Sequence, residues 1–212
     1  MPRRLIDKGL KELSKMILDM GLYSYASFER AVEAMRKRRD IREELVARSY
    51  QLMMKREEIN SLAIELIARY QPLASDLRYL KSVMEIAYNL LRIGRYSADI
   101  AVSISDYLMD DIDCETSLLE DLISKVDDML QLTLDIVEHP DADKAEKIYS
   151  LDEEVNDEYR NVLEKILNIN DVKCGLALAL IARYLERIGD HSYYIADSVY
   201  YYLNGHRLIR KW

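Results

Sequence analysis

Apolar residues recur at helical spacing along almost the whole chain and predict six long helices. In the first segment, Leu10, Leu13, Ile17 and Met20 lie three or four residues apart, as on one face of an α-helix. The expected helices span about residues 5–39, 41–70, 74–107, 115–138, 141–167 and 172–203. Pro-containing breaks separate several of them, and Asp171 is expected to cap the start of the last one. The pattern therefore predicts an all-α fold.

The third and sixth expected helices are copies of one another. Residues 76–107 and 171–202 align without gaps and share 12 identities in 32 positions, including a Leu-x-Arg-Ile-Gly segment in each. We therefore expect a tandem repeat of two three-helix bundles, covering residues 1–108 and 109–212.

The later copy carries acidic side chains that the earlier copy lacks. Glu186 and Asp190 in the sixth helix correspond to Leu91 and Arg95 in the third. A helical wheel gathers the apolar residues of the sixth helix on one side, which we expect to be its core face. The opposite side, expected to face solvent, holds Glu186, Asp190, Tyr193 and Asp197.

These acidic residues have the spacing of a cation site. Two carboxylates four residues apart lie on neighbouring turns, close enough to bind one hard cation or to bridge two. Asp152 and Asn156 repeat this spacing on the fifth helix and add oxygen ligands, while Tyr193 and Asp197 extend the same face. We expect an open metal site on the surface of the second bundle. Ordinary solvated acids on an amphipathic helix give the same pattern, so the spacing alone leaves both interpretations open.

The matching face of the third helix is largely apolar where exposure to solvent would favour polar residues. It consists of Met84, Tyr88, Leu91, Arg95, Ala98 and Val102. Because an apolar stripe of this length is seldom left in water, we expect another surface to cover it, as a dimer interface or a partner-docking face.

Composition narrows the class of protein. The 212 residues are 50% hydrophobic with six Gly and three Pro, which favours a globular helical chain. The formal charge of −8 is uneven, because residues 1–108 carry +4 and residues 109–212 carry −12. We find no bilayer-spanning run or secretory signal and expect a cytoplasmic protein. Cys114 and Cys174 lie 60 residues apart without a CxxC pattern and are expected to be reduced, structural thiols.

Taken together, the motifs resemble the PhoU family of phosphate-uptake regulators. The resemblance rests on Gln71-Pro72-Leu73-Ala74-Ser75-Asp76-Leu77-Arg78 and on the two Leu-x-Arg-Ile-Gly segments, and it covers essentially the whole chain. It implies two similar three-helix bundles, frequent dimers and, in some members, iron, zinc or other metal on a Glu/Asp-x-x-x-Asp signature. Carried over to this chain, the ligands are Glu186 and Asp190, with Asp152 and Asn156 from the companion helix.

The first repeat departs from the family signature. Leu91, Arg95 and Arg56 stand at the corresponding positions, so at most one of the two family metal sites is expected here. The resemblance implies a non-enzymatic negative regulator that connects a phosphate-specific ABC transporter to a phosphate-sensing histidine kinase. We expect a homodimer, peripheral to the membrane at most, with no direct nucleic-acid partner. The alternatives are a metal-dependent carboxylate-bundle enzyme and a metal-free helical adaptor.

Overall fold

The computed structural model describes residues 2–109 and 114–208. Its elements are α1 (Pro2–Lys37), α2 (Arg42–Tyr70), α3 (Ala74–Tyr107), the 3-10 helix η1 (Thr116–Leu119), α4 (Glu120–Glu138), α5 (Ala142–Ile166) and α6 (Val172–Asn204). All six expected helices are present, and this part of the chain contains no strand, so the all-α prediction is confirmed. The fourth helix differs from expectation only in starting as a turn of 3-10 helix.

Local signals in the sequence explain where several helices start and end. The Asp171 carboxylate accepts a hydrogen bond of 2.8 Å from the backbone N–H of Cys174 and so caps α6, as expected. Gly205 ends the same helix with φ of 80°, a left-handed conformation that costs glycine little. Asp141 caps α5 in the same way, through a 2.9 Å bond from the Lys144 N–H.

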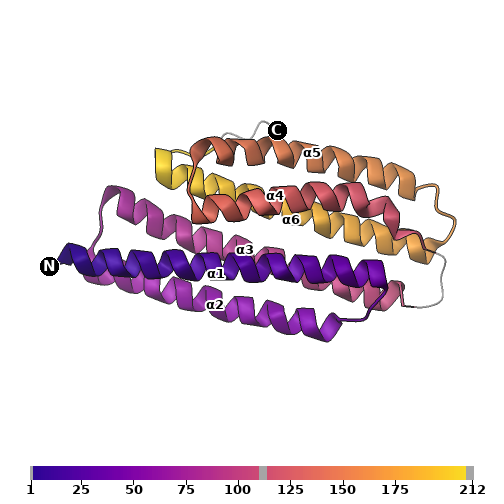
Figure 1. The fold of residues 1–212 in the computed structure, drawn as a ribbon, viewed down its shortest axis with the longest axis horizontal. Coiled ribbons are helices and arrows are strands. Elements are labelled where there is room, and N and C mark those ends of the chain that lie inside the picture. Colours follow the sequence, from indigo (N-terminus) through magenta and orange to yellow (C-terminus); the bar gives the residue numbers. More distant parts are fainter. Residues whose placement is uncertain (1, 110–113, 209–212) are drawn as a thin grey trace.

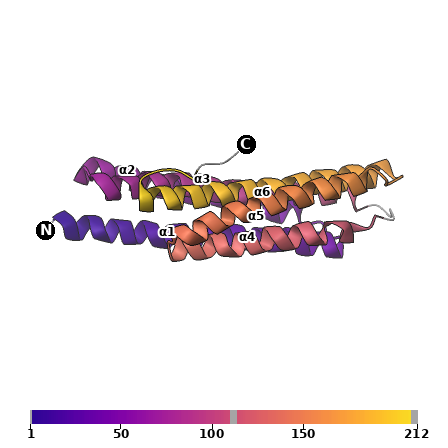
Figure 2. The ribbon, with the colours of Figure 1, turned by 90° about the horizontal axis from the view of Figure 1, so that it is seen from above.

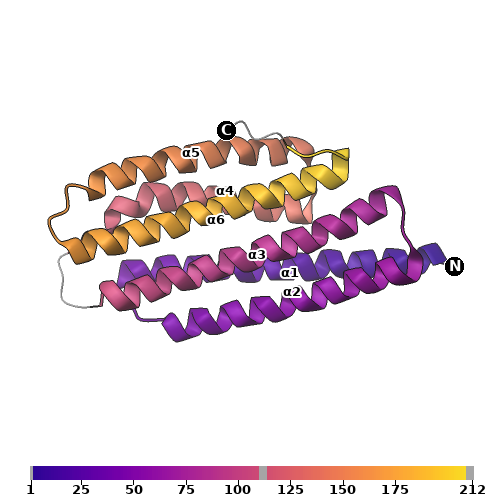
Figure 3. The same cartoon turned by 180° about the vertical axis from the view of Figure 1, so that it is seen from behind.

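The helices form two three-helix units that lie side by side, α1–α3 and α4–α6 (Figure 1). Seen from above, α1 and α4 lie in one layer and α2, α3 and α6 in another (Figure 2). From behind, α3 and α6 run next to each other at the junction (Figure 3), and they make the most extensive contact between any two helices. The expected acidic connection falls largely on residues 110–113, outside the described residues, and the division at residue 108 stays a prediction.

The central position of α6 changes which of its faces are buried. This helix packs on α3, α4 and α5, so apolar residues on more than one side contribute to the core. A helical wheel assumes one buried face, which suits a helix at the rim of a bundle but not one enclosed by three neighbours. None of the described helices has a stretch that is both long enough and apolar enough to cross a bilayer.

The expectation of two reduced thiols is wrong in this structure. Cys114 and Cys174 form a disulfide, which ties the segment before η1 to the first turn of α6. Both residues are buried, and Arg38 at the end of α1 donates a 2.6 Å hydrogen bond to the Cys114 carbonyl. The sequence could not predict this pairing, because the two cysteines are 60 residues apart and only the tertiary fold brings Cys114 next to α6.

Candidate metal centre

The predicted metal ligands lie between α5 and α6, and they are buried rather than open to solvent. Glu186 is 8% exposed, Asp190 6% and Asp152 2%, so the expected open site is wrong in this respect. Asn156 is half-buried, and its amide donates a 3.3 Å bond to Asp152 Oδ2. The i, i+4 spacing on α5 does align an amide with a carboxylate, as the sequence indicated.

Two arginines of α6 contact the carboxylates directly. Arg183 Nη1 lies 2.7 Å from Glu186 Oε1, and Arg187 Nη1 lies 2.9 Å from Asp190 Oδ2. The other oxygen of Glu186, Oε2, is buried without a hydrogen-bond donor, and the nearest cation is Arg187 Nε at 3.8 Å. The cluster is thus rich in oxygen ligands, and arginine neutralises part of its charge.

The electrostatics of Glu186 reflect both burial and its acidic neighbours. Burial raises the pKa of the Glu186 carboxyl above its ordinary value, and the charges of Asp190 and Asp152 raise it further. Arg183 and Arg187 act in the opposite direction without cancelling the effect. An added cation would favour the ionised form of Glu186, because it would offset the burial and the neighbouring negative charges that disfavour that form.

By its chemistry, this donor set fits a hard cation. Carboxylate and amide oxygens suit such ions, and the buried Glu186 Oε2 accepts no hydrogen bond that a metal ion would have to displace. Within residues 2–109 and 114–208, however, no three His, Cys, Asp or Glu side chains converge closely enough to hold a metal ion. The described arrangement is therefore one in which arginine engages the carboxylates, and metal coordination would require side chains to rotate.

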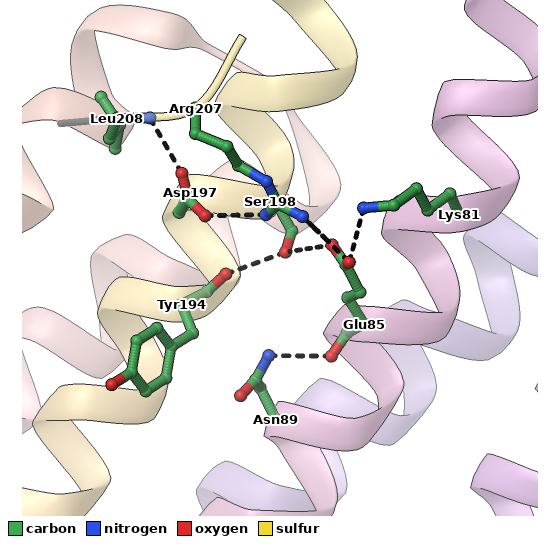
Figure 4. Close-up of polar contacts among 8 residues, drawn as sticks. All are labelled: Lys81, Glu85, Asn89, Tyr194, Asp197, Ser198, Arg207 and Leu208. Atoms are coloured by element: carbon green, nitrogen blue, oxygen red, sulfur yellow. Dashed lines mark hydrogen bonds and ion pairs between the residues drawn. The ribbon is translucent and has the colours of Figure 1, made fainter. Parts of the chain in front are cut away.

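Two further residues expected on the metal face have other contacts. Tyr193 is buried and packs on Tyr149 of α5, with ring centroids 5.9 Å apart. Asp197 belongs to a different network, in which it accepts hydrogen bonds from Arg207 Nη1 at 2.7 Å and from the Leu208 N–H at 2.9 Å (Figure 4). Asp197 is thus a ligand of the segment that follows α6, and its assignment to the metal face is not supported.

Arg207 also connects the two three-helix units. Its guanidinium reaches across to Glu85 on α3, with Nη2 lying 2.9 and 2.7 Å from the two carboxylate oxygens (Figure 4). Lys81 and Ser198 donate to the same carboxylate at 2.6 and 3.2 Å. Burial alone would raise the pKa of Glu85, but the bonds from Lys81 and Arg207 outweigh it and hold the pKa below its ordinary value.

A second contact between the two repeats involves His191 of α6. Its Nδ1 lies 2.7 Å from Asn89 Oδ1 on α3. Because the Asn89 amide already donates to the Glu85 carbonyl, its oxygen is the acceptor and the His191 Nδ1–H is the donor. Burial lowers the pKa of His191 to about 4, helped by the charges of Arg92 and Arg187, so this histidine is neutral near pH 7.

The apolar stripe on α3 is covered in part by the same chain. Leu91 and Ala98 are each 5% exposed and line a small pocket of about 170 Å³ against α2. Met84 and Tyr88 face a wider groove of about 850 Å³ between α2, α3 and α6, where Tyr88 is 46% exposed. For Leu91 and Ala98 the covering surface is therefore α2. The idea that a second subunit must cover them is wrong, while the oligomeric state itself stays a prediction.

The remaining stripe residues are not enclosed to the same degree. Arg95 is exposed, and Val102 is half-buried. Position by position, the residues aligned with the acidic cluster do not form one site in the first repeat, because Arg95 lies in the small pocket and Arg56 in the wider groove.

Sequence reasoning missed the arginines that accompany the acids. Arg183 precedes Glu186 by three residues and Arg187 precedes Asp190 by three, a spacing that places opposite charges side by side on a helix. That signal was present in the sequence. By contrast, the partnership of Glu85 with Arg207 spans 122 residues and required the fold.

These observations define a class of protein, a duplicated three-helix bundle whose second copy holds buried carboxylates at the positions where the first copy has Leu91 and Arg95. The PhoU domain model matches residues 17–104 and 119–199, one match in each unit. The chain belongs to the PhoU family.

Individual relatives agree with this assignment. A PhoU homologue of Clostridium acetobutylicum, named a phosphate-specific transport system accessory protein, is 27% identical over 97% of both chains. A protein of the same name from Caulobacter vibrioides is 30% identical over 77% of this chain and 74% of its own length. The crystal structure of the phosphate transport system regulatory protein PhoU from Streptococcus pneumoniae superposes with a TM-score of 0.90 at 22% identity, covering 97% of this chain and all of that one.

Proposed function

We propose that this protein is a non-enzymatic cytoplasmic regulator of phosphate uptake and phosphate signalling. The observation that carries the proposal is the PhoU match in both three-helix units, together with relatives named for the phosphate-specific transport system. In this account the protein acts as a negative regulator on a phosphate-specific ABC transporter and on its sensor histidine kinase. It works as a homodimer and is peripheral to the membrane at most.

The proposal includes a metal ion on the second unit. Glu186, Asp190, Asp152 and Asn156 would hold it, and iron or zinc is the expected element. Support comes from the oxygen ligands that α5 and α6 provide and from Glu186 Oε2, which is buried and accepts no hydrogen bond. A bound cation would offset the mutual repulsion of the carboxylates there. The first unit would provide contact surface instead.

Uptake of radiolabelled phosphate tests the regulatory role. A bacterium lacking its own homologue, grown with ample phosphate, should take up less phosphate when this chain is expressed. The Glu186→Ala/Asp190→Ala variant should lose that effect, whereas Arg160→Gln on the exposed side of α5 should keep it. Unchanged uptake with folded wild-type protein would contradict the regulatory proposal.

A metal-free helical adaptor is the second candidate, and one observation favours it. The arginine contacts already neutralise part of the acidic cluster, so less of its charge is left for a cation to balance. Purified protein that never binds divalent or ferric ions would establish this alternative. The carboxylate-bundle enzyme has less support. Its ligands would be buried acids, as here, but the sequence contains no Glu-x-x-His motif, which such enzymes use.

A further inference from the structure

Two arginines form ion pairs with the carboxylates that would bind the proposed metal ion. Arg183 contacts Glu186 at 2.7 Å, and Arg187 contacts Asp190 at 2.9 Å. Each pair is separated by three residues of one helix, so α6 itself brings the cation to the acid without help from another element. A metal ion entering this cluster therefore competes with charges that are already in place.

The acids and the arginines differ in their freedom to move. The Glu186 and Asp190 side chains are 10% and 8% exposed, whereas Arg183 and Arg187 are 39% and 40% exposed. The bundle therefore encloses the carboxylates, while the guanidinium groups reach solvent. Arg183 also lies 5.8 Å from the Tyr159 ring centroid, a surface that can hold it after it leaves Glu186.

The first repeat shows the same arginine without an acidic partner of this kind. Arg92 corresponds to Arg187, but Leu91 and Arg95 stand where Glu186 and Asp190 would be. Arg92 turns instead to Tyr96, donating to its hydroxyl and lying 4.6 Å from the ring centroid. In the first repeat, the guanidinium at this position thus packs on an aromatic ring in place of a carboxylate contact.

We propose that Arg183 and Arg187 are internal counter-ions that a metal ion must displace, and that they set how tightly the cluster binds it. The inference rests on the proposed metal site and adds residues that regulate its occupancy. Because like charges repel, removing one arginine should tighten cation binding by about three- to tenfold, a range that allows for partial solvent screening. Without a bound metal ion, the two arginines also neutralise part of the negative charge of the carboxylates.

Titration of metal-free, full-length protein with Mn²⁺, followed by electron paramagnetic resonance, tests this proposal. The Arg183→Gln/Arg187→Gln variant should bind Mn²⁺ at least about tenfold more tightly than wild type. Arg183→Lys/Arg187→Lys, which keeps both charges, should remain close to wild type. Arg160→Gln removes a charge from an exposed i, i+3 pair on α5 and should change the affinity by less than about twofold. Thermal unfolding of each variant verifies the fold.

The remaining variant separates failure of the counter-ion proposal from failure of the metal site. Loss of Mn²⁺ binding in Glu186→Gln/Asp190→Asn, with equal or weaker binding in Arg183→Gln/Arg187→Gln, would overturn the counter-ion role and leave the site standing. Wild-type affinity in Glu186→Gln/Asp190→Asn would overturn the site and the counter-ions with it. Absence of binding in every variant would overturn both. Binding only after removal of the arginines would support the counter-ions and refute a metal site in the wild type.

Discussion

The helices α3 and α6 are copies placed side by side, and they carry different side chains next to the Arg-Ile-Gly segment that they share. The arginine of this segment in α6, Arg187, forms an ion pair with Asp190. Its counterpart in α3, Arg92, packs on the ring of Tyr96. Leu91, which replaces the first carboxylate, packs against α2 instead of binding polar groups. Two differences on one scaffold thus separate a buried polar cluster in α6 from a packed Leu91 and an exposed Arg95 in α3. The helical frame is retained in both copies, so the chemistry can change without a change of fold.

The largest effect is expected at His191, which stands where the first repeat has Tyr96. In the unfolded chain the His191 side chain binds a proton near pH 6.5, but in the folded protein it does so only near pH 4. Its contribution to the free energy of unfolding should therefore be fully present above pH 6.5. That contribution should fall by about 3 kcal/mol as the pH drops to 4. Urea unfolding across this range measures it.

The His191→Gln variant isolates this contribution from the other acids. It keeps a hydrogen-bond donor for Asn89 but does not titrate, so its unfolding free energy should fall less steeply between pH 6.5 and 4. Parallel curves for the two proteins would show that His191 is not a buried neutral group.

A smaller change in the free energy of unfolding is expected when Gly94 and Gly189, which occupy equivalent positions in α3 and α6, are replaced by alanine. A Cβ at Gly94 would lie 2.0 Å from Leu52 Cδ1, whereas one at Gly189 would lie 3.1 Å from Val155 Cγ1. Because Leu52 is fully buried, Gly94→Ala should lower the free energy of unfolding by about 1–2 kcal/mol. Gly189→Ala should stay within about 0.5 kcal/mol, since better helix propensity offsets the mild crowding. Equal costs would mean that α2 approaches α3 no more closely than α5 approaches α6.

The smallest effect concerns Arg207, the link between α3 and α6. Arg207→Met should lower the unfolding free energy by about 1 kcal/mol at neutral pH, a modest value because the pair is partly exposed. The pKa of Glu85 is held below its ordinary value of 4.5, so this stabilisation is complete above that pH and is lost as the pH falls through the lowered pKa. Arg160→Met is the matched control. A difference that persists in strong acid would exclude the ion pair as its cause.

Much of the fold could be predicted because the signals are local. Apolar spacing located all six helices. Asp171 marks the start of α6 through its side-chain carboxylate, and Gly205 ends that helix in a left-handed backbone conformation. The duplication gave the arrangement of two similar units. These features depend on residues only a few positions apart in the sequence.

The rest depended on which surfaces meet. The sequence could not reveal that α6 is enclosed on three sides, and so Glu186 and Asp190 were expected in solvent although they are buried. The Cys114–Cys174 disulfide and the Glu85–Arg207 link join distant segments through the tertiary fold alone. The acidic residues on α5 and α6 could be found from their spacing in the sequence, while their burial could not be predicted.

The central claim is that cation chemistry belongs to the second repeat only, and the metal content of purified protein tests it most directly. The experiment compares three proteins: wild type, Glu186→Gln/Asp190→Asn, and Asp99→Asn, which removes a half-buried carboxylate of α3. Each would be loaded with iron or zinc and dialysed, and its metal content would then be measured by elemental analysis. The account predicts that wild type and Asp99→Asn retain the metal and that Glu186→Gln/Asp190→Asn loses it. Equal metal content in all three proteins would contradict the claim.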